Sequence, residues 1–251
     1  MTPSSEPDEL PASIRAAWGL SERPRRGPKP ALSLERIVGT AAAVAASEGL
    51  AAVSMQRVAA ELGSSPMGLY RYVASKDELL ALMADGALGE PPAELPEDWR
   101  GGLERWARAQ HDAYLRHPWA LGIPAGPAVT PNLTRWLEHG LRALAATGLG
   151  EAEKLSVLLL LSGYVRNSAA LGAQLAVRPG DPEAGVMPSW GRRLGLLVDA
   201  ERFPALSSAL ASGVFAHDDP PDEEFTFGLE RVLDGVEALV RAKAARAPER
   251  P

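Results

Sequence analysis

Apolar residues recur every three or four positions through most of the 251-residue chain, and glycine and proline separate the repeating stretches. This spacing is typical of amphipathic α-helices, and no stretch alternates apolar and polar residues for long enough to indicate a strand. The first helix is expected to begin after Ser33 and to end at Gly49. Further helices are expected near residues 97–116, 132–147, 152–177, 189–200, 204–213 and 223–246. The pattern therefore predicts an all-α protein.

Two short helices are predicted after the first one, and a tight turn separates them. Ser54 is a typical N-cap for the first of the two, and Gly63 stands where a left-handed residue ends it. Ser65 and Pro66 then supply an N-cap and a first-position proline for the next helix. This arrangement is a helix-turn-helix, whose second helix enters the DNA major groove, although an ordinary helical hairpin has the same spacing.

A fourth helix completes the N-terminal unit, because Ser75 and Glu78 have the spacing of a capping box. The Gly- and Pro-containing stretch that follows, residues 89–96, is expected to be a loop between domains. The predicted organisation is an extended or disordered basic arm at 1–32, a three-helix bundle with the helix-turn-helix at 33–88, and a larger helical domain at 89–251. Mobile loops are predicted at 178–188 and 216–222.

The net charge of −6 hides a strong asymmetry along the chain. Residues 15–76 carry nine Lys and Arg against four Asp and Glu, whereas residues 77–251 carry 17 against 25. Part of the basic excess lies in the predicted arm, at Arg23, Arg25, Arg26 and Lys29. A basic end on an acidic body predicts that this end of the protein binds a polyanion.

Several function classes are disfavoured by the residues that the chain lacks. It contains no cysteine, which excludes disulfides, thiolate metal sites and cysteine nucleophiles. It has no phosphate-binding glycine loop, nucleophile elbow or paired metal-binding histidines, so a helical enzyme with scattered carboxylates is the remaining enzymatic alternative. The apolar run at 155–161 is too short to span a bilayer, and the first 20 residues lack a signal-peptide pattern. We expect a cytoplasmic protein without a metal, a cofactor or a membrane contact.

The helix after Ser65 has the features of a DNA-reading element. Leu69 and Val73 are four residues apart and are expected to face the core. The outward side then consists of Pro66, Met67, Gly68, Tyr70 and Arg71. Arginine donates two hydrogen bonds to guanine, and apolar side chains contact thymine methyl groups. Lys76 starts the next helix, where its ammonium group and the free backbone N–H groups favour a phosphate.

Three stretches of this unit, Ser54–Gly63, Leu69–Val73 and Ser75–Leu80, together carry a more specific signal. Over residues 33–83 the chain closely resembles the TetR family of transcriptional regulators. The resemblance implies phosphate contacts from Tyr70, Tyr72 and Lys76. It implies contacts with base edges or nearby backbone from Gln56, Arg57, Pro66, Met67, Gly68 and Arg71. Because Pro66 and Gly68 replace polar residues that are common in the family, base recognition is expected mainly from Gln56, Arg57 and Arg71.

Residues 225–240, together with His117–Trp119 and Pro131–Asn132, resemble the tetracycline-repressor-like C-terminal domain. This resemblance implies a helical domain that binds a small molecule and whose last long helices pair with those of a second subunit. The residues favour the same pairing, since the helix at 152–177 is apolar nearly all round from Leu155 to Leu161. Burial of these residues within a monomer is the alternative.

Aromatic and polar side chains of this domain are candidates for effector contacts: Trp106, Gln110, Tyr114, Trp119, Trp136, Tyr164 and Asn167, with Trp99, His111 and His139 near them. Aromatic residues at helical spacing are more often part of a core. The sequence as a whole predicts a homodimeric regulator that binds a palindromic double-stranded DNA operator and is released by a small molecule of unknown identity. The resemblance favours a repressor, and a ligand-responsive activator is the alternative, since both use the same surface.

Overall fold

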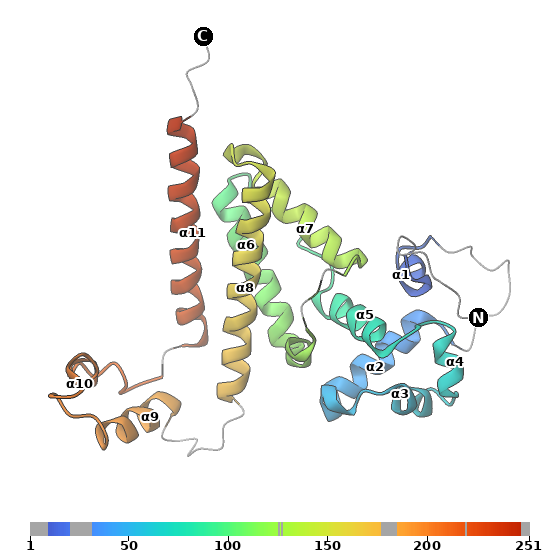
Figure 1. Ribbon diagram of the computed structural model, residues 1–251, viewed down its shortest axis with the longest axis horizontal. Coiled ribbons are helices and arrows are strands. Elements are labelled where there is room, and N and C mark those ends of the chain that lie inside the picture. The colour runs from blue at the N-terminus through green and yellow to red at the C-terminus, as the bar shows by residue number, and fades with distance from the viewer. Residues whose placement is uncertain are drawn as a thin grey trace, which may run out of the picture.

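The computed structural model describes residues 10–20, 32–124, 126, 128–176, 185–218 and 220–246. The α-helices in these ranges are α1 Ala12–Ala17, α2 Leu34–Glu48, α3 Met55–Glu61, α4 Pro66–Tyr70, α5 Lys76–Leu88, α6 Trp99–Arg116, α7 Pro131–Ala143, α8 Glu151–Ala176, α9 Val186–Gly195, α10 Pro204–Ala211 and α11 Pro221–Arg246. Short 3-10 helices are η1 Leu50–Ala52, η2 Pro118–Gly122 and η3 Ala145–Thr147. No strand occurs in the described ranges, and the all-α prediction is confirmed (Figure 1).

The N-terminal helices begin and end at the predicted residues because local groups satisfy their free backbone atoms. The hydroxyl of Ser33 accepts a hydrogen bond from the N–H three residues later at 3.2 Å, and that of Ser54 does the same at 3.1 Å. Gly49 and Gly63 end α2 and α3 at φ values of 85° and 61°. A side chain is strained at such φ values, so glycine is the residue that stops each helix.

Two hydrophobic clusters form the core. The first lies among α2, α3, α4 and α5 around fully buried residues such as Ile37, Leu69 and Leu79, and it also includes Ile123 from beyond η2. The second lies among α6, α7, α8 and α11 and includes Leu161. Helix α5 leads from the first cluster to the second, and it lies between the two groups of helices in Figure 1.

Residues 12–17 form helix α1, which corrects the prediction that all of residues 1–32 are extended or disordered. Ile14 of α1 is 6% exposed and belongs to the first cluster, and Ser13 Oγ donates a hydrogen bond to Glu78 Oε2 at 2.7 Å. A helix of six residues is too short to be stable by its own propensity. Contact with α2 and the hydrogen bond to Glu78 of α5 stabilise it. The four basic residues of the predicted arm, at 23–29, lie outside the described residues.

Glu78 departs from the predicted capping box at the start of α5. The Ser75 hydroxyl accepts from the N–H of Glu78 at 3.1 Å, as predicted. The Glu78 carboxylate accepts from the N–H of Ala74 at 2.9 Å, one residue before the N–H that a capping box uses. The hydrogen bond from Ser13 to the same carboxylate oxygen is the physical reason we assign to this shift.

The helices between α8 and α11 differ in extent from the predicted ones. Helix α9 begins at Val186, inside the predicted loop at 178–188, and α11 begins at Pro221, inside the predicted loop at 216–222. Residues 178–184 of the first predicted loop and residue 219 of the second lie outside the described ranges. In Figure 1, α9 and α10 extend away from the other helices, and Trp190 of α9 packs edge-on against Phe215 at 5.2 Å between ring centroids.

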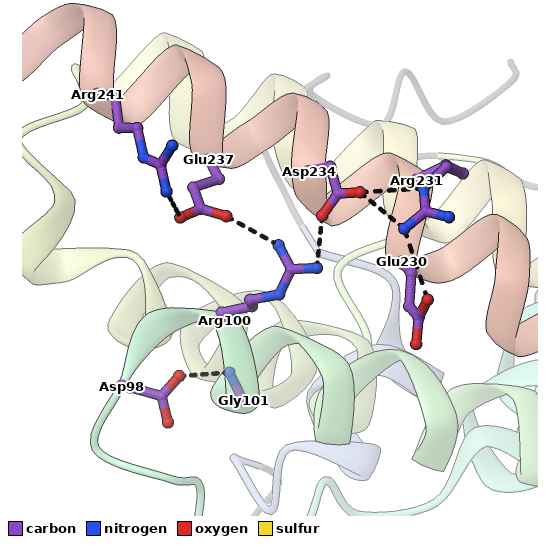
Figure 2. A network of polar contacts seen from close by, with 8 residues as sticks. All are labelled: Asp98, Arg100, Gly101, Glu230, Arg231, Asp234, Glu237 and Arg241. Atoms are coloured by element: carbon purple, nitrogen blue, oxygen red, sulfur yellow. Dashed lines mark hydrogen bonds and ion pairs between the residues drawn. The ribbon is translucent and has the colours of Figure 1, made fainter.

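A polar network joins α11 to α6 (Figure 2). Arg100 of α6 donates a hydrogen bond to Asp234 at 2.7 Å and forms an ion pair with Glu237 at 3.3 Å. Arg231 of α11 pairs with the same Asp234 at 2.8 Å. The hydrogen bonds from Arg100 and Arg231 hold the pKa of Asp234 below its ordinary value. Because these side chains are solvent-exposed, the network contributes to the orientation of α11 more than to the stability of the fold.

Candidate DNA interface and effector cavity

Helices α3 and α4 form the predicted helix-turn-helix. The Ser65 hydroxyl accepts a hydrogen bond from the N–H of Gly68 at 3.2 Å, and Pro66 occupies the first position of α4. Leu69 and Val73 are completely buried in the first cluster. This burial fixes which side of α4 faces outward, and the N-terminal end of a short, well-capped helix is the part that reads bases in such motifs.

The outward side of the motif carries most of the predicted DNA contacts. Met67 is 75% exposed and Tyr70 is 46% exposed. Gln56, Arg71 and Lys76 are exposed as well, and no hydrogen bond or ion pair with another described residue engages their side chains. Two cations, an amide, an aromatic ring and a thioether are therefore available on one face. This mixture suits phosphates, base edges and thymine methyl groups together.

Arg57 is already engaged inside the protein. Its guanidinium pairs with Glu48 and with Glu61, at 2.7 Å in each case. These hydrogen bonds raise the pKa of Arg57 and lower that of Glu48. The two carboxylates offset the positive charge of Arg57, so its contact with DNA stays a prediction. The spacing of Arg57 and Glu61, four residues apart on a helix, is the sequence signal for this pairing.

Three other predicted contact residues are half-buried. Tyr72 donates its hydroxyl hydrogen to the backbone oxygen of Leu32 at 3.0 Å, which holds the chain leading into α2. Pro66 and Gly68 are partly covered, and a β-carbon at Gly68 would lie 2.7 Å from Ser64 Oγ. A larger residue at this position therefore requires the Ser64 hydroxyl to rotate away, whether or not DNA approaches it.

A cavity of about 590 Å³ lies next to the DNA-binding helices, between α5, α6, η2, α7 and α8. Its walls are mostly apolar, and its polar groups include Asp77, Asp85, Thr130 and Arg166. Arg166 donates hydrogen bonds to the backbone oxygens of Leu121 and Ile123, at 2.6 and 2.5 Å, and its guanidinium lies 5.7 Å from the Tyr114 ring centroid. An apolar cavity of this volume with a few fixed polar groups is typical of a small-molecule site.

Of the predicted effector residues, Tyr114 lines this cavity, and the structure places the others elsewhere. Trp106, Gln110 and Trp136 are buried, and both indole N–H groups are used: Trp106 donates to Trp136 O and Trp136 to Gly89 O, each at 2.9 Å. Tyr164 donates its hydroxyl hydrogen to Phe225 O at 2.8 Å. These side chains hold helices together, so their contact with an effector stays a prediction.

The remaining candidates also lie in packing positions or on the surface. Trp119 packs against the first cluster and Trp99 against the second, whereas Asn167 is exposed. His111 is buried and stacks on Phe225 at 3.9 Å between centroids, and burial lowers its pKa. His139 has a buried Nδ1 atom without a hydrogen-bond partner among the described residues, and it lines a separate, more open hollow beside residues 90–93.

Sequence reasoning missed the wall that α5 contributes to the cavity. Leu80, Ala84 and Leu88 all line it, and they are four residues apart along one helix face. That four-residue repeat is visible in the sequence, but residues that pack in a closed core show the same repeat, so it does not indicate a cavity. Arg166 gave no signal, because its partners are backbone oxygens more than 40 positions away.

Two further observations bear on the class of protein. No group of three His, Asp or Glu side chains within the described ranges is placed to hold a metal ion. The part of helix α8 from Glu151 to Gln174 is long and apolar enough to cross a membrane by length and composition. Of its most apolar 18-residue stretch, 28% is buried inside the protein. Length and composition do not distinguish a membrane span from a helix that pairs with another subunit.

Comparison with known proteins identifies the family. Residues 37–83 match the family of bacterial regulatory proteins of the tetR type, and residues 91–240 match the tetracyclin repressor-like C-terminal domain. The chain belongs to the TetR family of bacterial transcriptional regulators. Both matches agree with the helix-turn-helix at α3 and α4 and with the helical unit that follows it.

Several relatives of the chain are named as transcriptional repressors. The repressor DrrR1 of Streptomyces coeruleorubidus is 36% identical over 250 residues, which cover 95% of this chain and 90% of DrrR1. The class A tetracycline repressor of transposon 1721 from Escherichia coli is 27% identical over 195 residues, or 75% of this chain and 82% of that protein. ActR from Streptomyces coelicolor has been solved as the apoprotein and in complex with actinorhodin. Each structure superposes on this chain with a TM-score of 0.69 and 30% sequence identity. The match covers 83% of this chain and 98% of ActR.

Proposed function

We propose that this TetR-family chain is a transcriptional repressor that binds a palindromic operator and leaves it when a small molecule binds. The observation that carries the proposal is the outward face of α3, α4 and the start of α5. The exposed residues there are Gln56, Met67, Tyr70, Arg71 and Lys76. The names of the relatives support repression rather than activation. The partner is double-stranded DNA, and the protein acts in the cytoplasm.

The operator is palindromic because the active form is a homodimer. Exposed apolar side chains lie on α8 and α11, the two long helices that stand beside each other in Figure 1; they include Leu155, Leu159, Leu160, Phe227 and Leu239. A groove between the helices is lined by Val157, Leu160, Val232, Val236 and Leu239. An apolar face of this kind on a soluble regulator supports pairing with the same helices of a second copy. This pairing also accounts for the apolar composition of α8.

The effector site is the cavity between α5, α6, η2, α7 and α8. Its volume fits a drug-sized molecule, and the Tyr114 ring and the aliphatic walls suit a flat apolar body. The guanidinium of Arg166 donates to two backbone oxygens through one nitrogen, so its other N–H groups favour an acceptor or anionic group on the ligand. ActR, whose fold this chain shares, has been solved with actinorhodin bound, which supports a ligand-binding role for the C-terminal helices here.

Release follows from the position of α5. This helix starts at Lys76 on the DNA side and lines the cavity with Leu80, Ala84 and Leu88. Two recognition helices enter successive major grooves only at a separation of about 34–36 Å, so a change in the tilt of α5 changes DNA affinity. A ligand shifts that tilt only by its difference in affinity for the two states.

The test of the proposal is selection of DNA by the purified protein. Random-sequence duplexes retained by the chain are sequenced, and the enriched operator is placed upstream of a reporter transcribed in vitro. We expect two inverted half-sites and lower transcription when the protein is added. Enrichment of no sequence refutes the DNA-binding assignment, whereas a selected operator that raises transcription favours an activator.

A Leu159→Arg variant, which places a charge on the α8 face, is expected to sediment as a monomer and to lose affinity for the paired sites.

A further inference from the structure

The start of α7 is held by the DNA-binding helices. Thr130, at the N-cap position of α7, makes no side-chain hydrogen bond to the helix. The carboxylate of Asp85, on α5, instead accepts from the N–H groups of Asn132 at 3.3 Å and Leu133 at 2.9 Å. The Asn132 side chain donates back to the backbone oxygen of Asp85 at 3.1 Å. Helices α2 to α6 carry their own Ser or Asp caps, whereas α7, like α9 with Asp218, is capped by a carboxylate from a distant part of the chain.

A second contact reaches the same segment from α1. The indole N–H of Trp18, at the end of α1, donates to the backbone oxygen of Val129 at 2.7 Å. Helix α1 is itself fixed to the DNA-binding unit by the burial of Ile14 and by the hydrogen bond from Ser13 to Glu78. Figure 1 shows α1 beside the end of α7 that lies next to α5. Residues 129–133, which we call the entry segment of α7, are therefore bound to the DNA-binding unit at two points.

The entry segment is also part of the cavity wall. Thr130 and Leu133 line the cavity, and so does Asp85. A molecule that fills the cavity thus contacts the residues through which α7 is joined to α5. Helix α1, by contrast, lies outside both parts of the chain that match the family models, which begin at residue 37.

We propose that α1 is a positioning element for DNA binding: with Asp85, it fixes the entry segment of α7 to the DNA-binding unit and so sets the tilt of α5. The inference rests on the proposed repressor function and on the cavity as its effector site. Asp85 is nine residues from Lys76, or about 13 Å along a helix. A rotation of α5 of about 10° at Asp85 therefore moves Lys76 by about 2 Å, comparable with the displacement of roughly 3.4 Å that one base pair adds between half-sites. Loosening the entry segment widens the range of separations that the two recognition helices adopt.

The first measurement is discrimination between half-site spacings by a Trp18→Phe variant, which replaces the indole by a smaller aromatic ring and removes the N–H donor. Wild-type protein and variant are titrated with the selected operator, with the same operator carrying one extra base pair at its centre, and with a single half-site. We expect the ratio of affinities for the two full operators to fall at least about fivefold, the factor equivalent to one lost hydrogen bond of about 1 kcal/mol, because each protomer of the dimer loses one. Affinity for the single half-site is expected to stay unchanged, because α3 and α4 are intact.

The controls separate this effect from general damage. Trp190→Phe makes the same chemical change on α9, away from the cavity, and is expected to keep the wild-type ratio. Asp85→Ala is expected to lower the ratio as Trp18→Phe does, whereas Asp98→Ala, which removes a cap that α6 provides for itself, is not. A wild-type ratio in Trp18→Phe overturns the proposal.

A second measurement does not depend on any DNA. Amide hydrogen exchange at Asn132 and Leu133 reports the opening of the entry segment, and we expect it to be about fivefold faster in Trp18→Phe than in the wild-type protein or in Trp190→Phe. Unchanged exchange at these amides overturns the role of α1 even if the chain binds its operator as proposed. Faster exchange in a chain that selects no DNA supports the tether and refutes only the repressor function.

Discussion

Gly228 of α11 lies against the Tyr164 ring of α8, and its replacement by alanine tests how tightly the two helices are packed. A β-carbon at Gly228 would lie 2.3 Å from the hydroxyl oxygen of Tyr164 and 2.7 Å from the ring carbon that carries it. Carbon atoms in contact are normally about 3.5–4.0 Å apart, so either α11 moves outward by about 1 Å or the Tyr164 ring leaves its place. Overpacking of this kind costs about 1–3 kcal/mol.

Two smaller contributions act in opposite directions. Displacement of Tyr164 also breaks its hydrogen bond to Phe225 O, which contributes about 0.5–1.5 kcal/mol, while alanine gains about 0.8–1.0 kcal/mol over glycine in a helix. We therefore expect Gly228→Ala to lower the free energy of unfolding by about 1–2 kcal/mol, measured by urea denaturation at a fixed protomer concentration. Gly39→Ala is the matched control, because no heavy atom lies within 4 Å of its β-carbon position in α2. We expect that control to be stabilised by about 0.8–1.0 kcal/mol.

The refuting result is equal stability of Gly228→Ala and Gly39→Ala, which would mean that the Tyr164 ring is not held against α11. The double variant Gly228→Ala/Tyr164→Ala sharpens the comparison. If the ring is the obstacle, adding Gly228→Ala to a Tyr164→Ala protein raises its stability by the helix-propensity gain of about 0.8–1.0 kcal/mol. The interaction between the two substitutions is measured as the departure from additivity.

Three further predictions concern DNA binding and pH. Lys76→Ala is expected to weaken binding to operator and random DNA alike in a filter-binding assay. Arg71→Ala should weaken binding to the operator preferentially, by roughly 1–3 kcal/mol for a lost bidentate base contact. Equal losses on both DNAs would show that Arg71 contacts phosphate. Replacing the four basic residues at 23–29 by serine should flatten the salt dependence of the binding constant by about 0.9 log unit per lost phosphate contact, and an unchanged slope would exclude such contacts. Burial lowers the pKa of His111, so the unfolded chain binds a proton at this residue at a higher pH than the folded chain does. The stability that the buried neutral imidazole contributes is therefore lost as the pH falls below about 6.5. His111→Gln should reduce that acid sensitivity in thermal unfolding at pH 5 relative to pH 7.5, and an identical pH dependence in wild type and variant would contradict it.

The sequence predicted the helix-turn-helix accurately because its signals are local. Ser54, Gly63 and Ser65 act on backbone groups within three residues of themselves, so their effect does not depend on the rest of the fold. Leu69 and Val73 are both buried, as predicted, but α4 ends at Tyr70, so helical spacing accounts for Leu69 alone and Val73 is buried in the turn that leads to α5.

Features that depend on distant contacts were not predictable in this way. Helix α1 is stabilised by residues more than 60 positions away, such as Glu78, and the short apolar stretch around Ile14 shows no period that distinguishes it from an extended arm. The proposed effector cavity is formed by segments that come together only in the fold. The sequence suggested tryptophans for an effector site, and the structure uses them in packing. Trp106 and Trp136 donate to backbone oxygens inside the protein. Large aromatic residues mark a helical domain that needs a core, but they do not show where that core is left open.

The presence of Ile123 in the first hydrophobic cluster has a consequence for engineering. Regulators are commonly recombined by joining the DNA-reading part of one protein to the sensing part of another, and residue 88 is an obvious point for such a junction here. A junction at residue 88 joins Ile123, on the sensing part, to foreign DNA-reading helices. In this protein Ile123 is only 5% exposed because it packs between the side chains of its own DNA-reading helices. A foreign residue that fails to fill the same space leaves a void costing about 2–5 kcal/mol. A working hybrid therefore needs the donor to bring residues 118–124 and α1 together with α2 to α5, so the transplantable unit is discontinuous in the gene.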